Sequence, residues 1–178
     1  MPVRPLVMFP DPRLRMVAEP VRMFDASLRA LAADLLDTLR AAPGIGITAP
    51  HIGVTLRLVV LELTQGEVRS YANPEVVWAA AELTQHPEGS IAMPGVTEVI
   101  ARPARIELRY QDLDGEAHTE AAEGLLAVCH QHEVDQLDGI FWLQRLSRLK
   151  RDRAVKRYGK LLLAPRRDDS ASVSPRSR

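Results

Sequence analysis

The segment RIELRYQDLDGEAHTEAA, residues 105–122, constrains the fold of this chain more than any other segment. Ile106, Leu108 and Tyr110 alternate with polar residues, and the pair Asp114-Gly115 follows them. Alternation with a period of two is typical of a strand that buries one face, and Asp-Gly favours a tight hairpin turn. The segment therefore predicts two antiparallel strands joined at Asp114-Gly115.

Two further segments predict strands before this hairpin. The apolar, β-branched run at 56–64 predicts a buried strand. Residues 67–79 predict two short strands that are interrupted at Asn73-Pro74. Strands therefore dominate the middle of the chain.

Helical periodicity marks segments nearer to both ends. In the first of them, Asp25 or Ser27 can cap a helix that Pro43-Gly44 ends. The second stops at Gly139, and the third is amphipathic and basic. Helices near the ends with strands between them indicate an α+β fold rather than an alternating βαβ sheet. The predicted helices cover residues 24–44, about 124–137, and 147–163.

The length of 178 residues predicts one domain, which we place at residues 1–163. Residues 164–178 lack apolar content and are expected to form a disordered polar and basic tail. Cys129 is the only cysteine, which excludes an intramolecular disulfide and fits a reducing compartment. Because neither a signal peptide nor a long apolar stretch is present, we expect a cytoplasmic protein without membrane contact.

The net charge of zero hides an asymmetry along the chain. Residues 1–144 hold 11 Lys+Arg against 20 Asp+Glu, whereas residues 145–178 hold 12 against 3. A basic end on an acidic body can attract a polyanion, and nucleic acid or a ribosome surface is the obvious candidate. The alternative is a solvated helix face followed by a frayed terminus.

Two predicted loops contain residues that commonly build a site. Residues 43–53, PGIGITAPHIG, include three glycines that let the backbone approach a ligand closely. Residues 86–95, HPEGSIAMPG, contain Glu-Gly-Ser and Pro-Gly. Each segment taken alone is equally well explained as a turn.

The predicted helix at 124–137 carries the third candidate segment. His132-Glu133 opens the metallohydrolase pattern H-E-x-x-H, but Gln136 stands where the second histidine belongs. His132, Glu133 and Gln136 project from neighbouring positions of the helix, whereas His130 points elsewhere. Taken alone, a single histidine on a helix is more often a core residue than a ligand.

The order and spacing of the three segments resemble the three signature blocks of the peptide deformylases. In this sequence the blocks read G-I-G-x-x-A-P-x-x-G, E-G-S-I-x-x-P-G and G-L-L-A-x-x-x-Q-H-E-x-D-x-L-x-G. The resemblance extends to FPDPRLR near the start, NPEVV at 73–77 and ARPARIELRYQDLDG at 101–115, and so spans roughly residues 3–150.

The resemblance implies antiparallel sheets around a central helix that carries the His-Glu motif, with helices near both termini. It implies removal of the formyl group from the N-terminal methionine of nascent proteins. In that family a metal, usually Fe²⁺ or Zn²⁺, is held by a cysteine of the second block and two histidines of the third. The C-terminal helix of the family can dock on the ribosome.

Several family roles transfer directly to residues of this chain. Glu133 matches the general acid/base and His132 matches the first histidine ligand. Ile91 would supply the backbone N–H that stabilises the oxyanion. The methionine pocket would be lined by Ile45, Gly46, Gly89, Leu125, Val128 and Cys129.

The departures from the family fall on the reactive positions. Ser90 replaces the cysteine ligand, Gln136 the second histidine ligand, and His51 the glutamine that stabilises the oxyanion; Thr48 also replaces a family alanine. A serine hydroxyl is a poor ligand because it does not ionise as a thiol does, and a neutral glutamine oxygen binds zinc or iron more weakly than imidazole. We therefore expect weak or absent metal binding and very low deformylase activity.

Three functions remain open at this point. The chain can be a non-catalytic relative that binds N-terminal formyl-methionyl or methionyl peptides or a ribosomal surface. It can be a metal-dependent amide hydrolase with a rearranged site, in which His51 and His132 are ligands. It can also be an interaction module that no longer uses the pocket. Metal content separates the second function from the others, and peptide binding separates the first from the third.

Overall fold

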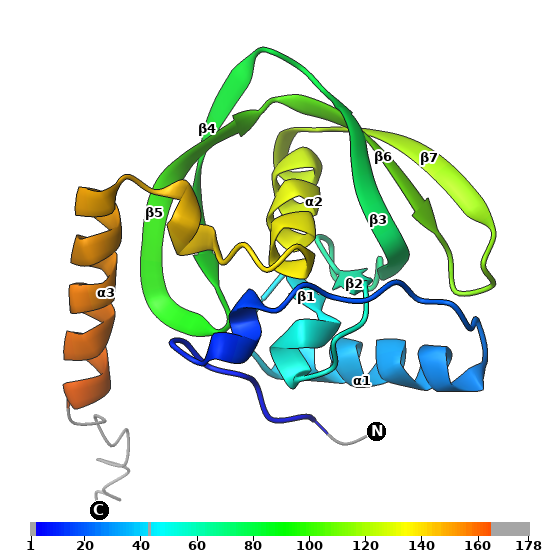
Figure 1. Ribbon diagram of the computed structural model, residues 1–178, viewed down its shortest axis with the longest axis horizontal. Helices are drawn as coiled ribbons and strands as arrows, with labels where there is room; N and C mark the ends of the chain where they lie inside the picture. Colours follow the sequence, from blue (N-terminus) through cyan, green and yellow to red (C-terminus); the bar gives the residue numbers. More distant parts are fainter. Residues whose placement is uncertain (1–2, 43, 165–178) are drawn as a thin grey trace, which may run out of the picture.

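The computed structural model of this chain describes residues 3–42 and 44–164. Helix α2 lies at the centre, with the β4–β5 hairpin on one side and strands β3, β6 and β7 on the other (Figure 1). This arrangement confirms the predicted α+β fold of antiparallel sheets around a central helix. In chain order the elements are η1 (Pro12–Arg15), α1 (Ala26–Ala41), β1 (Gly46–Thr48), η2 (Ala49–Ile52), β2 (Leu58–Leu61), β3 (Arg69–Ala79), β4 (Leu83–Ser90), β5 (Met93–Pro103), β6 (Arg105–Gln111), β7 (Ala117–Glu123), α2 (Gly124–Leu137), η3 (Trp142–Arg145) and α3 (Arg148–Leu163).

The larger sheet has the order β1-β2-β3-β6-β7, and each neighbouring pair is antiparallel. The hairpin predicted at 105–122 is confirmed as β6 and β7. In its turn, the Asp112 side chain accepts hydrogen bonds from the backbone N–H groups of Asp114 and Glu116, and Gly115 adopts φ 87°. The strand predicted at 56–64 is confirmed in its buried centre, as β2.

Residues 67–79 form one strand, so the predicted interruption at Asn73-Pro74 is wrong. Strand β3 continues through these residues with a shift of register against β6 between Ala72 and Glu75. Asn73 adopts φ 51°, and its side chain bonds to the backbone N–H and C=O of Val21 and to the Gln111 side chain. These bonds stabilise a bulge, and the strand resumes beyond it.

The two predicted loops contain regular structure. Residues 86–95 belong to β4, β5 and their tight turn rather than to a loop, because Leu83 to Glu88 pair with Pro103 to Glu98. Residues 46–52 form β1 and η2, and Gly53 follows with φ 79°. The hydrophobic alternation of β4 is weak, which explains why the sequence did not predict this strand.

The predicted helices are confirmed with small changes at their ends. Asp25, rather than Ser27, caps α1 by accepting from Ser27 N–H at 2.9 Å and Leu28 N–H at 3.2 Å. Helix α1 ends at Ala41, and Pro43 lies outside the described residues. The disordered tail predicted at 164–178 also lies outside them, apart from Ala164.

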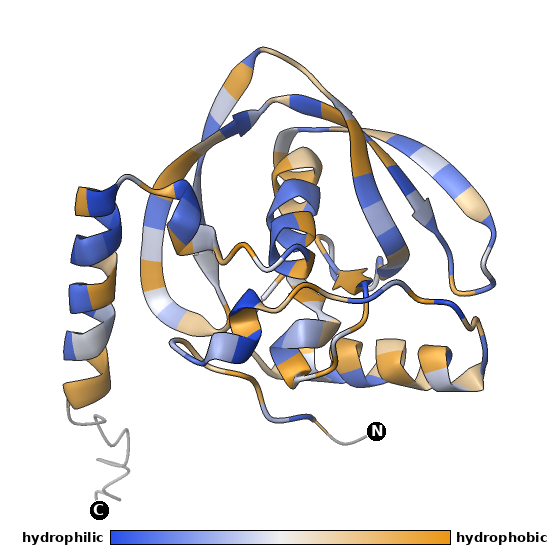
Figure 2. Cartoon of the chain, in the orientation of Figure 1, coloured by the Kyte–Doolittle hydropathy of each residue, from blue (hydrophilic) through white to orange (hydrophobic). Residues whose placement is uncertain are grey.

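The core divides into clusters around α2. Leu35 and Leu39 of α1 pack with Ile47 and Leu58 beneath the sheet. A second cluster joins the sheet to the end of α2, and a third joins β5 to α3. Figure 2 shows α3 as hydrophilic over most of its length and hydrophobic at its C-terminal end. None of the described helices is long and apolar enough to cross a membrane.

Candidate functional site

A cavity of about 420 Å³ lies between α2, the β4–β5 hairpin and residues 42–51. It brings together residues from the three segments that the sequence singled out. Ser90 and Ile91 come from the hairpin, His132 and Glu133 from α2, and His51 from η2. The predicted pocket residues Ile45, Gly46, Gly89, Leu125, Val128 and Cys129 also line this cavity.

Two glycines allow the walls of the cavity to approach each other. A Cβ atom on Gly46 would collide with the Glu133 carboxylate and would lie 2.8 Å from Leu61 Cδ2. A Cβ atom on Gly89 would lie 2.8 Å from the Val96 carbonyl oxygen of the paired strand. Only glycine leaves room at these positions, so the sequence GIG and EGS patterns have a steric cause.

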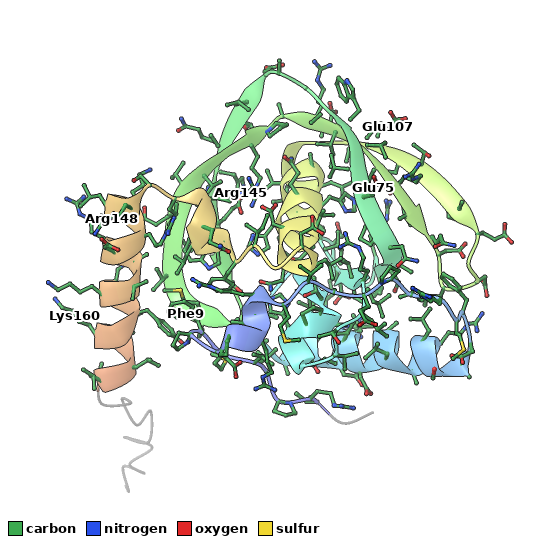
Figure 3. All side chains as sticks on the ribbon, viewed as in Figure 1. Phe9, Glu75, Glu107, Arg145, Arg148 and Lys160 are labelled. Carbon is green, nitrogen blue, oxygen red and sulfur yellow. The ribbon has the colours of Figure 1, made fainter. Side chains whose placement is uncertain are left out.

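A chain of buried charged groups orients His132. Its Nδ1 lies 3.0 Å from Glu88 Oε2. Arg102 donates to both Glu88 oxygens, at 2.5 and 2.9 Å, and to Asp135 at 2.8 Å. Arg145, which extends from η3 towards α2 (Figure 3), donates from Nε to Asp135 at 2.8 Å. Since Arg102 forms a forked pair with Glu88, it fixes the carboxylate that holds the imidazole.

These bonds determine which nitrogen of His132 carries the proton. Burial raises the pKa of Glu88, but the hydrogen bonds from His132 and Arg102 lower it further, to about 2. An ionised carboxylate only accepts hydrogen bonds, so His132 donates from Nδ1–H, and Nε2 of the neutral ring keeps its lone pair. Burial lowers the pKa of His132, yet the bond to Glu88 and the charge of Glu133 outweigh it and raise that pKa overall.

His51 has the opposite arrangement of protons. Its ring is buried, and Nδ1 accepts a hydrogen bond from Thr48 N–H at 3.1 Å. The neutral ring therefore carries its proton on Nε2, which has no hydrogen-bond partner among the described residues. Burial, together with the charge of His132, lowers the pKa of His51 to about 3. His51 thus contributes a neutral N–H donor to the cavity.

Glu133 is the second polar group of the cavity without a partner. It is 5% exposed, and its Oε2 accepts no hydrogen bond from the described residues. Burial raises the pKa of Glu133 to about 6, although the charge of His132 opposes this rise. A carboxyl group with this pKa can exchange a proton near neutral pH.

The other two positions that correspond to family metal ligands have protein partners. Ser90 Oγ accepts a hydrogen bond from Ala92 N–H at 3.1 Å. Gln136 donates from Nε2 to the Leu14 carbonyl oxygen at 2.8 Å and is not among the residues that line the cavity. Within residues 3–42 and 44–164, no group of three or more His, Cys, Asp or Glu side chains is arranged to hold a metal ion.

Cys129 and His130 lie on different sides of α2. Burial, with the charges of Glu133 and Glu88, raises the pKa of Cys129 to about 12, so its thiol stays protonated in the cavity wall. His130 is buried edge-on against Tyr71, with ring centroids 4.6 Å apart, which confirms that it points away from His132. His130 is therefore a core residue.

Sequence reasoning missed the groups that support His132. Glu88 precedes Ser90 by two residues, and a strand assignment for β4 would have placed both side chains on one face. Arg102 becomes a neighbour of Glu88 only through the register of β4 against β5, and no local pattern announces that register. The roles predicted for the lining residues stay predictions, although the structure brings all of them except Gln136 to the cavity.

Comparison with known proteins assigns the chain to a family. The family described as polypeptide deformylase matches residues 3–152. A protein of Brucella melitensis biotype 1 named "Peptide deformylase-like" is 65% identical over 162 residues, which cover 90% of this chain and 99% of the relative. A peptide deformylase of Phenylobacterium zucineum is 44% identical over 164 residues, with 90% and 97% of the two chains covered.

The crystal structure of a peptide deformylase from Legionella pneumophila has the same fold. It superimposes with a TM-score of 0.86 at 36% identity, and the match covers 91% of this chain and 96% of that chain. The chain belongs to the polypeptide deformylase family.

Proposed function

We propose that this protein binds N-terminal formyl-methionyl or methionyl peptides and lacks the ordinary metal-dependent activity of its family. The observation that carries this proposal is the fate of the three positions that correspond to the metal ligands. Ser90 and Gln136 are not thiolate or imidazole donors, and Gln136 is bonded to Leu14. One strong donor, His132, remains at those positions. Such a set does not fit Fe²⁺ or Zn²⁺, which need several nitrogen or sulfur donors.

The cavity supports the peptide-binding part of the proposal. Its apolar wall, with Leu125 and Val128, suits a methionine side chain. Beside that wall, His51 offers an N–H donor and Glu133 an acceptor, and both lack partners among the described residues. An amide group supplies one acceptor and one donor, so an N-terminal formyl-amide is complementary to this pair.

An active metal site built from His51 and His132 is the alternative. It requires a lone pair on His51 Nε2, because that is the nitrogen without a protein partner. The hydrogen bond from Thr48 N–H to Nδ1 places the proton on Nε2 instead. The geometry therefore favours His51 as a donor to the ligand over His51 as a metal ligand.

The first experiment compares the natural chain with a variant in which the family residues are restored, His51→Gln/Ser90→Cys/Gln136→His. We expect little bound iron or zinc in the natural chain and orders of magnitude slower hydrolysis of a formyl-methionyl peptide than in the restored variant. Elemental analysis and formate release provide the two measurements. One equivalent of tightly held metal with fast turnover in the natural chain would refute the proposal.

The second experiment tests peptide binding by titration calorimetry with a formyl-methionyl tripeptide. Leu125→Glu should abolish binding, since it places a charge on the apolar wall of the cavity. Leu149→Glu, an exposed leucine of α3 outside the cavity, is the matched control and should leave binding unchanged. Absence of binding to the natural chain would favour an interaction module that does not use the pocket.

We also propose that α3 contacts the ribosome. The helix carries seven Lys or Arg residues and one Asp between Arg148 and Leu163. Its buried residues, Ala154 and Tyr158, pack on the body of the protein, which leaves the basic positions at the surface. The chemistry of such a surface suits a polyanion, and RNA is the abundant polyanion of the ribosome.

A further inference from the structure

Glu88, His132 and Ser90 lie together at the cavity in a way that the metal chemistry of the family does not require. Glu88 and Ser90 come from the end of β4, and His132 faces them from α2. We propose that these residues form a metal-independent acyl-transfer centre, with Ser90 as nucleophile, His132 as general base and Glu88 as positioning residue. The inference rests on the proposed function, because its substrate is the formyl-amide of the peptide in the cavity.

The hydrogen bonds of His132 prepare it for the role of a base. Glu88 is held ionised by the fork of Arg102, so it accepts the proton of His132 Nδ1–H. The lone pair of the neutral ring is therefore on Nε2, the nitrogen that activates a hydroxyl in Ser-His-carboxylate hydrolases. Arg102 also binds Asp135, so two elements besides β4 support this orientation.

Ser90 has a hydroxyl proton to give. Its Oγ accepts a hydrogen bond from Ala92 N–H, which uses a lone pair of the oxygen and leaves its O–H free to donate. Ser90 and His132 line the same cavity. The bond from Ser90 O–H to His132 Nε2 is expected to form once the substrate fills the cavity, since catalytic hydrogen bonds often tighten on binding.

The surrounding groups provide for the charge that develops on the formyl oxygen. Ile91 N–H directly follows the nucleophile, the usual place of one oxyanion donor. His51 Nε2–H is a second N–H donor in the same cavity, and it has no partner among the described residues. The sequence change from glutamine to histidine at this position thus retains a neutral donor.

The reaction balances without a metal or a further reagent except water. Ser90 Oγ adds to the formyl carbon while His132 Nε2 takes the hydroxyl proton. The C–N bond of the tetrahedral adduct breaks, and His132 gives that proton to the departing amine nitrogen, which leaves a formyl ester on Ser90. Water then adds to the ester with His132 as base, and cleavage of the ester C–O bond returns the proton to Ser90 and releases formate.

The test uses the full-length protein after treatment with a chelator and an alkyl fluorophosphonate, which modifies activated serines. We expect one adduct, on Ser90 by peptide mapping, at a rate that excess formyl-methionyl tripeptide lowers. Ser90→Ala should remove the adduct, and His132→Gln should slow its formation roughly 100-fold or more. Ser70→Ala, on β3 and outside the cavity, should react as the natural chain does.

Peptide affinity, measured separately, distinguishes this proposal from the proposed function. Glu88→Gln should slow modification while the dissociation constant for the peptide stays unchanged, a split that a purely structural role would not give. Peptide binding without modification of Ser90, modification only when metal is present, or a rate that saturating peptide does not change would each overturn the acyl-transfer centre. Loss of peptide binding in the natural chain would instead overturn the proposed function.

Discussion

At the scale of single residues, Gly46 sets the shape of the cavity. Its position against Glu133 and Leu61 leaves no space for a Cβ atom. We expect Gly46→Ala to lower the free energy of unfolding by about 1–3 kcal/mol, because β1 must move or Glu133 must leave its rotamer. Peptide affinity should fall with it, and chemical denaturation with calorimetric titration provides both values.

Gly159 is the matched control for this substitution. It lies within α3, where a Cβ atom would meet nothing within 4 Å. Gly159→Ala should therefore raise the free energy of unfolding by roughly 0.5–1 kcal/mol, since alanine favours a helix more than glycine does. Equal effects of the two alanine substitutions would contradict the steric role of Gly46.

Tyr71 provides a residue-scale prediction at alkaline pH. Burial raises the pKa of Tyr71 from 10.0 to about 12, against the lowering effect of Arg69. A group whose pKa is raised by folding contributes stability that is complete below pH 10 and lost as the pH rises towards 12. Tyr71→Phe should thus lose less stability than the natural chain, by roughly 1 kcal/mol at pH 11. Denaturation curves of the two proteins that stay parallel between pH 9 and 11.5 would count against this assignment.

At the scale of elements, Arg102 connects β5 to β4 and α2. Its partners Glu88 and Asp135 are buried carboxylates. Arg102→Ala leaves both without their main cation, so we expect a loss of about 3–5 kcal/mol in the free energy of unfolding. The exposed Arg105, 3.8 Å from Glu82, is the control, and Arg105→Ala should change stability by less than about 0.5 kcal/mol. Comparable losses would mean that the buried network adds nothing.

The same elements show what the sequence could predict. The β6–β7 hairpin and the three helices follow from local periodicity and capping residues such as Asp25, and those predictions are confirmed. The continuity of β3 depends on Asn73, whose side chain bonds to Val21 and Gln111, far away in sequence. The support of His132 depends on strand register in the same way. Contacts of this kind leave no local pattern, whereas the residues of the cavity could be predicted because they stand in recognisable blocks.

At the scale of the whole molecule, charge is separated between the body and α3. Arg157 of this helix binds Glu98 and Arg151 binds the backbone of η3, which ties the helix to the body. Phe9 and Tyr158 add an edge-on aromatic contact. Figure 3 shows Arg148 and Lys160 extending from the outer side of α3. The helix is therefore fixed in place while its outer cations remain available to a partner.

This separation predicts salt-dependent binding to ribosomes. Lys156 and Lys160 are exposed, one helical turn apart, and no ion pair with another described residue is found for either. Lys156→Glu/Lys160→Glu should weaken cosedimentation with ribosomes, and the affinity of the natural chain should fall steeply with salt because binding releases counterions. Arg15→Glu/Arg22→Glu changes the net charge equally at exposed positions of the N-terminal segment and should bind as the natural chain does. Equal weakening by both variants would indicate general charge attraction, and no effect of either would mean that α3 is only a solvated helix.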